Sequence, residues 1–133
     1  MAINPNTVLA LELGRFYKGV AFEISEYIYH NISTIPKDQL TKLFDDETRI
    51  STYANTFFSL AENLVFSDDT QIVSLTNATE EVNIALKKIK KLNKIINISA
   101  SVITLATAIL NGNPQTIAKS VAEVIGAATK GDE

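Results

Sequence analysis

Apolar side chains recur every three or four residues along most of this chain. Within residues 5–32 they form a continuous row: Leu9, Leu13, Phe16, Val20, Ile24 and Tyr27. This spacing places side chains on one face of an α-helix, whereas a strand would alternate them between two faces. Asn4 before Pro5 favours a helix start. Pro36 predicts an end shortly before it, because a residue that precedes proline avoids helical geometry. We predict a first helix over residues 5–32.

The next segment predicts two further helices. Residues 37–44 place Leu40, Leu43 and Phe44 on one side of a short helix. Asp45 and Asp46 then predict a new helix start, since acidic side chains in a first turn interact favourably with the helix dipole. That second helix is expected to run to about residue 66. The run Ser67, Asp68, Asp69 marks the start of another.

From residue 75 the apolar pattern becomes a heptad repeat. Its first position holds Leu75, Val82, Ile89, Ile96, Ile103 and Leu110. Its second position holds Ala78, Ala85, Leu92, Ser99 and Ala106. No glycine or proline interrupts residues 78–110, so we predict one unbroken helix about 50 Å long. A compact chain of 133 residues has a radius of gyration of about 14 Å. The long helix should therefore protrude, bend or be shared with another copy.

The sequence Asn111-Gly112-Asn113-Pro114 predicts a stop, a turn and a new helix start. A last helix over residues 114–129 would then form a hairpin with the long one. Only 5 glycines and 3 prolines occur in the whole chain, which favours a few long elements. The predicted fold is all-α: a single domain, residues 1–133, with four to five helices around one long heptad-patterned helix and a C-terminal helical hairpin.

The charges are distributed unevenly. Residues 1–80 hold 11 acidic and 5 basic side chains, and the net charge of the chain is −3. An acidic body argues against nucleic acid as a partner, because phosphate contacts need basic surface. Five lysines gather before the apolar C-terminal half: Lys87, Lys88, Lys90, Lys91 and Lys94. They predict either the solvated face of a helix or contact with an anionic partner, such as an acidic protein or anionic lipid heads.

No catalytic or cofactor motif is present. The chain lacks cysteine, a glycine-rich phosphate loop, a GxSxG elbow and an HExxH zinc motif. His30 is the single histidine, and Glu23 and Glu26 could share its helix face. Carboxylates and an imidazole can hold a metal, but the di-iron bundle motif is Glu-x-x-His and needs a second copy. We therefore predict no enzymatic activity, no cofactor and no metal.

Residues 95–110 carry no charge, and their apolar side chains occur on nearly every side of the predicted helix. Such a helix must be covered on most sides. The cover could be the rest of the bundle, another chain or a membrane. The predicted contact residues are Ile95, Ile96, Val102, Ile103, Ile109, Leu110, Ile117, Val121, Val124 and Ile125. We predict a non-enzymatic interaction protein, a self-assembly subunit, adaptor or inhibitor, that binds itself or another protein.

The alternative is a membrane-active protein. Residues 87–128 combine a lysine-flanked apolar arm, a Gly-Asn-Pro turn and a second arm, and this composition resembles the insertion hairpins of helical pore-forming toxins. The resemblance implies insertion of residues 95–128. The sixteen uncharged residues 95–110 span only about 24 Å, which is short of a hydrocarbon core of about 30 Å. Small residues line both arms and would allow close helix approach: Ala100, Thr104, Ala108, Ala118, Ala122 and Gly126.

Residues 1–7 are polar and lack the basic segment of a secretory signal. We expect a cytoplasmic location, with non-classical export or membrane association as the alternatives.

Overall fold

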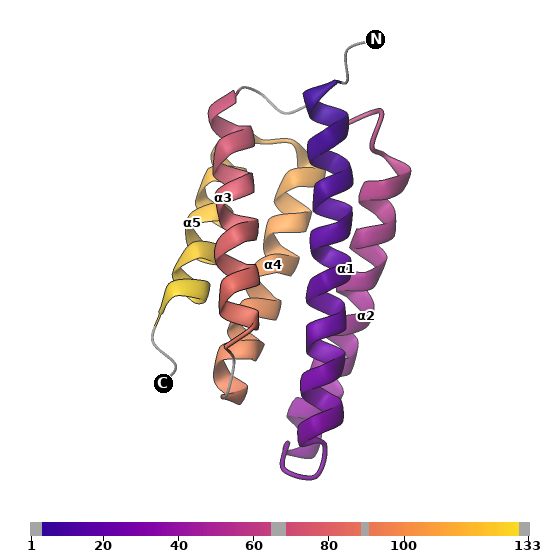
Figure 1. Ribbon diagram of the computed structural model, residues 1–133, viewed down its shortest axis with the longest axis vertical. Coiled ribbons are helices and arrows are strands. Elements are labelled where there is room, and N and C mark those ends of the chain that lie inside the picture. Colours follow the sequence, from indigo (N-terminus) through magenta and orange to yellow (C-terminus); the bar gives the residue numbers. More distant parts are fainter. Residues whose placement is uncertain (1–3, 65–68, 89–90, 131–133) are drawn as a thin grey trace.

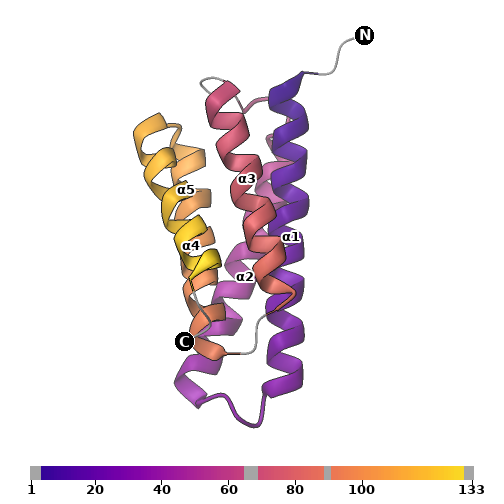
Figure 2. The ribbon, with the colours of Figure 1, turned by 60° about the vertical axis from the view of Figure 1, so that its left-hand side comes forward.

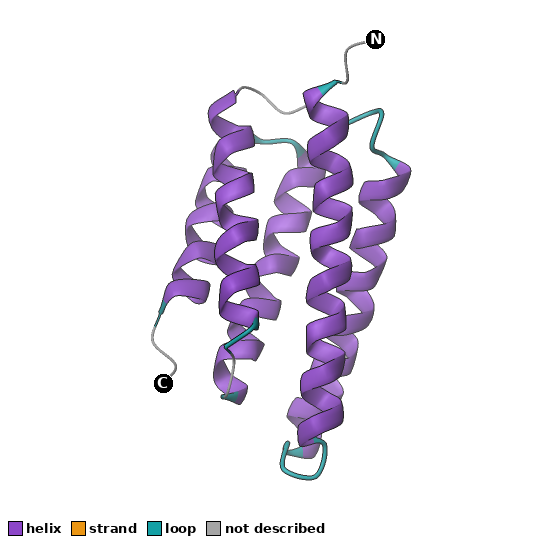
Figure 3. Ribbon diagram, viewed as in Figure 1, coloured by secondary structure: helices purple, strands orange, loops and turns teal. Residues whose placement is uncertain are grey.

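The structure is a computed structural model that describes residues 4–64, 69–88 and 91–130. Within these ranges the chain forms five helices and no strand (Figure 3). The helices are α1 (Pro5–Asn31), α2 (Lys37–Ser59), α3 (Asp69–Leu86), α4 (Leu92–Asn111) and α5 (Pro114–Thr129). The prediction of an all-α bundle is therefore confirmed.

The helices form two groups that pack side by side (Figures 1 and 2). One group is the antiparallel hairpin of α1 and α2, and the other consists of α3, α4 and α5. The hairpin contacts the second group through α2 against α4 and through α1 against α3 and α4. α2 and α4 run in the same direction (Figure 1).

The predicted helix ends depend on local hydrogen bonds. The side chain of Asn4 accepts a hydrogen bond of 2.9 Å from the amide of Asn6 at the start of α1. Gly112 ends α4 in the left-handed conformation, with φ of 77°. Asn113 then caps α5 by accepting bonds from the next amides, including that of Gln115 at 2.9 Å. Residues that favour these geometries occupy each position, so the first helix, the turn and the last helix agree with the sequence prediction.

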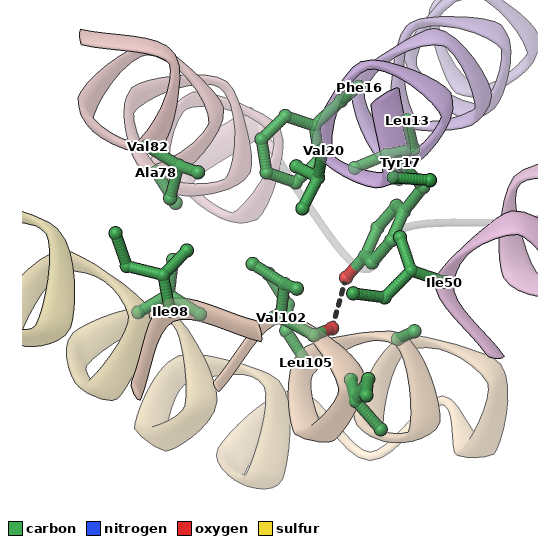
Figure 4. Close-up of a cluster of buried hydrophobic side chains, with 14 of the residues drawn as sticks. Leu13, Phe16, Tyr17, Val20, Ile50, Ala78, Val82, Ile98, Val102 and Leu105 are labelled. Carbon is green, nitrogen blue, oxygen red and sulfur yellow. Dashed lines mark hydrogen bonds between the residues drawn. The ribbon is translucent and has the colours of Figure 1, made fainter. Parts of the chain in front are cut away.

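One apolar core runs through all five helices. Figure 4 shows its central part, where side chains of α1, α2, α3 and α4 converge. Tyr17 lies fully buried there, and its hydroxyl donates a hydrogen bond to the carbonyl oxygen of Val102. The ring of Tyr17 packs between Phe16, at a centroid distance of 5.1 Å, and Phe57, at 5.3 Å. These rings fill the space where the hairpin meets the second group.

The prediction of one unbroken helix over residues 78–110 is wrong. α3 ends at Leu86 and α4 begins at Leu92, so the chain turns within the lysine cluster. The amide of Lys88 donates to the carbonyl of Ala85 as α3 ends, and Lys91 has extended geometry with φ of −119° and ψ of 138°. Lysines three and four residues apart repel one another in a continuous helix. The turn also folds both arms of the heptad against a common core, which a straight helix could not achieve.

The predicted boundary between residues 44 and 45 is also wrong, because α2 continues through it. Asp46 does not stabilise a helix start. It lies on the buried face of α2, between Leu43 and Ile50 in the apolar row, and only 4% of it is exposed. Its carboxylate accepts bonds from Lys42 and Ser99, which compensate its burial. The prediction that this helix runs to about residue 66 is wrong as well, because α2 ends at Ser59 and residues 60–63 form turns.

Candidate interaction surfaces

The apolar contact residues predicted from the sequence belong mainly to the core. Seven are buried within the chain: Ile95, Val102, Ile103, Ile109, Ile117, Val121 and Val124. Three are half-buried and pack against that core: Ile96, Leu110 and Ile125. In this fold the C-terminal hairpin is covered by the other helices, so its apolar face offers little free surface to a partner.

The lysine cluster lies in and next to the connection between α3 and α4. Lys87, Lys88 and Lys91 are exposed, while Lys90 lies outside the described residues. Lys94 is half-buried on the first turn of α4, and its ammonium group donates to the backbone carbonyl of Lys130 after α5. The structure thus places the exposed lysines at a turn instead of along one helix face. Contact with an anionic partner remains a prediction.

Glu23, Glu26 and His30 do share one side of α1, as the sequence indicated. They line a cleft of about 250 Å³ together with Tyr27, and Nε2 of His30 lies 3.3 Å from Oε2 of Glu26. Both side chains are largely exposed. Among the residues that the structure describes, no group of three or more histidine or acidic side chains is arranged to hold a metal ion.

Large apolar side chains are exposed near the closed end of the α1–α2 hairpin. We call Phe22, Tyr29, Ile32 and Phe44 the tip surface; their exposed fractions are 59%, 77%, 53% and 47%. The closed end extends beyond the ends of α3 and α4 (Figures 1 and 2). Helix lengths explain the projection, since 27 residues of α1 span about 40 Å and 18 residues of α3 span about 27 Å.

Three members of the tip surface flank one contact between the helices. The hydroxyl of Ser25 in α1 donates a 3.2 Å hydrogen bond to the carboxylate of Glu47 in α2. Phe22 and Tyr29 lie three residues before and four residues after Ser25, and Phe44 lies three residues before Glu47. Side chains at these spacings are neighbours on a helix surface. These spacings place Phe22 and Tyr29 on one face of α1, and Phe44 next to Glu47 on the surface of α2.

The tip surface was not predicted from the sequence. Phe22 and Tyr29 are seven residues apart, which places them on one helix face, but they lie outside the main apolar row of α1. That row predicts which side chains are buried. Apolar residues outside the row were therefore the signal from which an exposed apolar surface could have been predicted. Phe22 and Tyr29 both lie on the side of α1 opposite the buried row that contains Ile24, so the helical period accounts for their exposure.

A cleft of about 430 Å³ with polar side chains lies between α2 and α4. Lys42, Asp46 and Arg49 line it from α2, at positions that share one helix face. Thr104 and Thr107 line it from α4, and Thr107 lies 3.1 Å from the hydroxyl of Tyr53. The Asp46–Ser99 and Tyr53–Thr107 contacts hold α2 and α4 together along this groove.

No family model, curated protein or solved structure matches this chain.

Proposed function

We propose that this protein is a non-enzymatic interaction protein whose tip surface binds a second copy of the chain or another protein. The observation that carries the proposal is the exposure of Phe22, Tyr29, Ile32 and Phe44 on the α1–α2 hairpin, whose closed end projects from the bundle (Figure 1). Aromatic side chains are enriched where proteins bind one another, and clustered exposed apolar groups usually mark contact surfaces. This moves the proposed contact from the C-terminal hairpin to the N-terminal one.

The absence of an enzymatic role is part of the same proposal. His30 is the single histidine of the chain, and its side chain is 68% exposed beside Glu26. A catalytic base usually has a nucleophile or a substrate within hydrogen-bond reach and an environment that tunes it. In the described residues Nε2 of His30 lies beside the carboxylate of Glu26, and its ring makes an edge contact with the ring of Tyr29. Neither contact activates a nucleophile.

Self-association is the simplest form of the proposal, because most soluble oligomers are built from identical chains. Sedimentation velocity over a range of micromolar concentrations measures it directly. The wild-type chain should sediment as a species heavier than one copy. The triple variant Phe22→Ser, Tyr29→Ser, Phe44→Ser should sediment as a monomer, since it removes the aromatic rings of the tip surface.

The bundle offers a matched control. Val73 and Ile84 on α3 are 57% and 52% exposed, outside the tip surface. The double variant Val73→Ser, Ile84→Ser should keep the wild-type mass. Equal masses for wild type and both variants would contradict self-association through the tip.

A photo-crosslinking amino acid tests binding to a different protein. Placed at Tyr29, it should form crosslinks in the native cell that the same group at Val73 does not form. If neither position crosslinks and the wild-type chain is a monomer, the interaction proposal fails.

The second candidate function is membrane insertion of residues 95–128. One observation favours it: α4 has 20 residues and a mean hydropathy of 1.4 over its most apolar window, although half of that window is buried. Insertion would require α4 to leave the core, which would expose to water the apolar side chains of the other helices that now pack against Ile98 and Val102. Co-sedimentation with anionic liposomes and release of a trapped dye would test it. Protein that stays in the supernatant and releases no dye would rule it out.

A further inference from the structure

The cleft between α2 and α4 contains a cation without a partner. Lys42 and Arg49 both line it, and the ammonium group of Lys42 lies 3.2 Å from Oδ2 of Asp46. In the part of the chain that the structure describes, Arg49 forms no ion pair or hydrogen bond through its side chain. Asp46 is occupied by Lys42 and Ser99. Arg49 is exposed, and it is the cation of this cleft that pairs with no described carboxylate.

The opposite end of the cleft offers neutral hydrogen-bonding groups. Asn111, the last residue of α4, and Thr116, in the first turn of α5, both line it. Among the described residues, neither side chain forms a hydrogen bond. Between these groups and Arg49 lie the smaller side chains of Thr104 and Ala108. The cleft thus has a cationic end, a small-residue middle and a neutral polar end.

We propose that this cleft binds a small organic anion, whose carboxylate or phosphate group is held by Arg49. A guanidinium presents a planar set of donors that matches either group with two parallel hydrogen bonds. The cleft volume of about 430 Å³ lies within the range of small-molecule sites. The body of the ligand lies along Thr104 and Ala108, and a polar group at its far end reaches Asn111 or Thr116. This site is separate from the tip surface and does not depend on it.

Nuclear magnetic resonance titration of the full chain at constant ionic strength tests the proposal. The probes are inorganic phosphate, acetate and hexanoate, with butylammonium as a probe of opposite charge. Acetate and phosphate should shift amide signals around Arg49 and Thr104, and hexanoate should bind more tightly than acetate because its body fills the cleft. Butylammonium should leave these signals unchanged.

Two variants locate the site. Arg49→Gln should weaken anion binding by about tenfold or more, because it removes the charged donor. Arg15→Gln removes the other arginine of the chain, which lines a different cleft between α1 and α3, and should bind like wild type. Thr104→Phe should also block hexanoate, since the ring fills the middle of the cleft without changing its charge.

Three results would overturn the proposal. One is the absence of shifts with every anion. Another is equal weakening by Arg49→Gln and Arg15→Gln, which would indicate a general charge effect. The third is unchanged hexanoate binding in Thr104→Phe.

Discussion

The hydroxyl of Tyr17 in α1 donates a buried hydrogen bond of 2.6 Å to the carbonyl oxygen of Val102 in α4. This bond connects the two helix groups at the centre of the core (Figure 4). Burial raises the pKa of Tyr17 well above its ordinary value of 10.0, and the nearby Tyr53 raises it further. Tyr17 therefore stays protonated, and able to donate this bond, in strongly alkaline solution.

The first prediction follows from that raised pKa. Between the ordinary pKa and the folded-state pKa, the folded protein holds a proton that the unfolded chain has lost. The contribution of the protonated Tyr17 hydroxyl to the free energy of unfolding is fully present below about pH 10. It is lost as the pH rises through the folded-state pKa. Tyr17→Phe should lower the free energy of unfolding at pH 7 by about 1 kcal/mol, and should make it fall less steeply above pH 10. Urea unfolding across this range measures both effects. The exposed Tyr29→Phe is the control, and identical profiles for the two variants would contradict the assignment.

The second prediction compares two adjacent acids in α2. Asp46 is buried and bonded to Ser99 at 3.2 Å, whereas Asp45 is exposed. Asp46→Ala removes a buried charge-assisted bond between α2 and α4, so it should cost about 1.5–3 kcal/mol. Asp45→Ala should cost about 0.5 kcal/mol or less. Denaturant midpoints measure the loss of stability in both variants. A larger loss for Asp45→Ala than for Asp46→Ala would contradict this prediction and would favour the helix start predicted from the sequence at these acids.

The third prediction concerns two glycines of α1. A Cβ at Gly14 would lie 2.6 Å from Cε1 of Phe58, so this glycine allows α1 and α2 to approach closely. A Cβ at Gly19 meets nothing within 4 Å. Gly19→Ala should therefore stabilise the protein by about 0.5–1 kcal/mol through helix propensity.

Gly14→Ala should be less stable than Gly19→Ala, because the ring of Phe58 must move. Adding Phe58→Ala to each glycine variant is the control: it should reduce the difference between them. Thermal unfolding of the four variants measures this, and equal stability of Gly14→Ala and Gly19→Ala would show that the ring moves without cost.

The helix ends that the sequence predicted correctly are those with strong local signals. Asn4, Gly112 and Asn113 determine backbone geometry within a few residues of themselves, and the structure agrees at each. The turn between α3 and α4 has no glycine or proline in residues 78–110. It results from lysine repulsion together with the core that both arms share. A local sequence pattern does not predict these effects, because they depend on which helices pack together.

The two candidate sites were harder to predict for a related reason. The acids near residue 45 resemble a helix start, yet the apolar spacing continues through them from Leu43 to Ile50. Which acid is buried depends on Ser99, fifty-three residues away in the chain. Likewise, the projection of the α1–α2 hairpin depends on the length of α3 relative to α1. Both features are tertiary, so they become visible only when the helices are assembled.

The last prediction tests the small-residue row of the C-terminal hairpin. The sequence placed Ala122 in a row through which the last helix would approach its neighbour, and overpacking there should have destabilised the fold. The structure instead exposes Ala122, while Ala106 on α4 is fully buried. Ala122→Leu should therefore change stability by about 0.5 kcal/mol or less. Ala106→Leu should cost about 1–3 kcal/mol, because the core has no space for the added atoms.

Chemical denaturation measures the stability of both variants, and the comparison also bears on membrane insertion. If Ala122→Leu were the more destabilising change, α5 would pack through its small-residue row, as the toxin-like hairpin requires, and the bundle described above would be incorrect at α5.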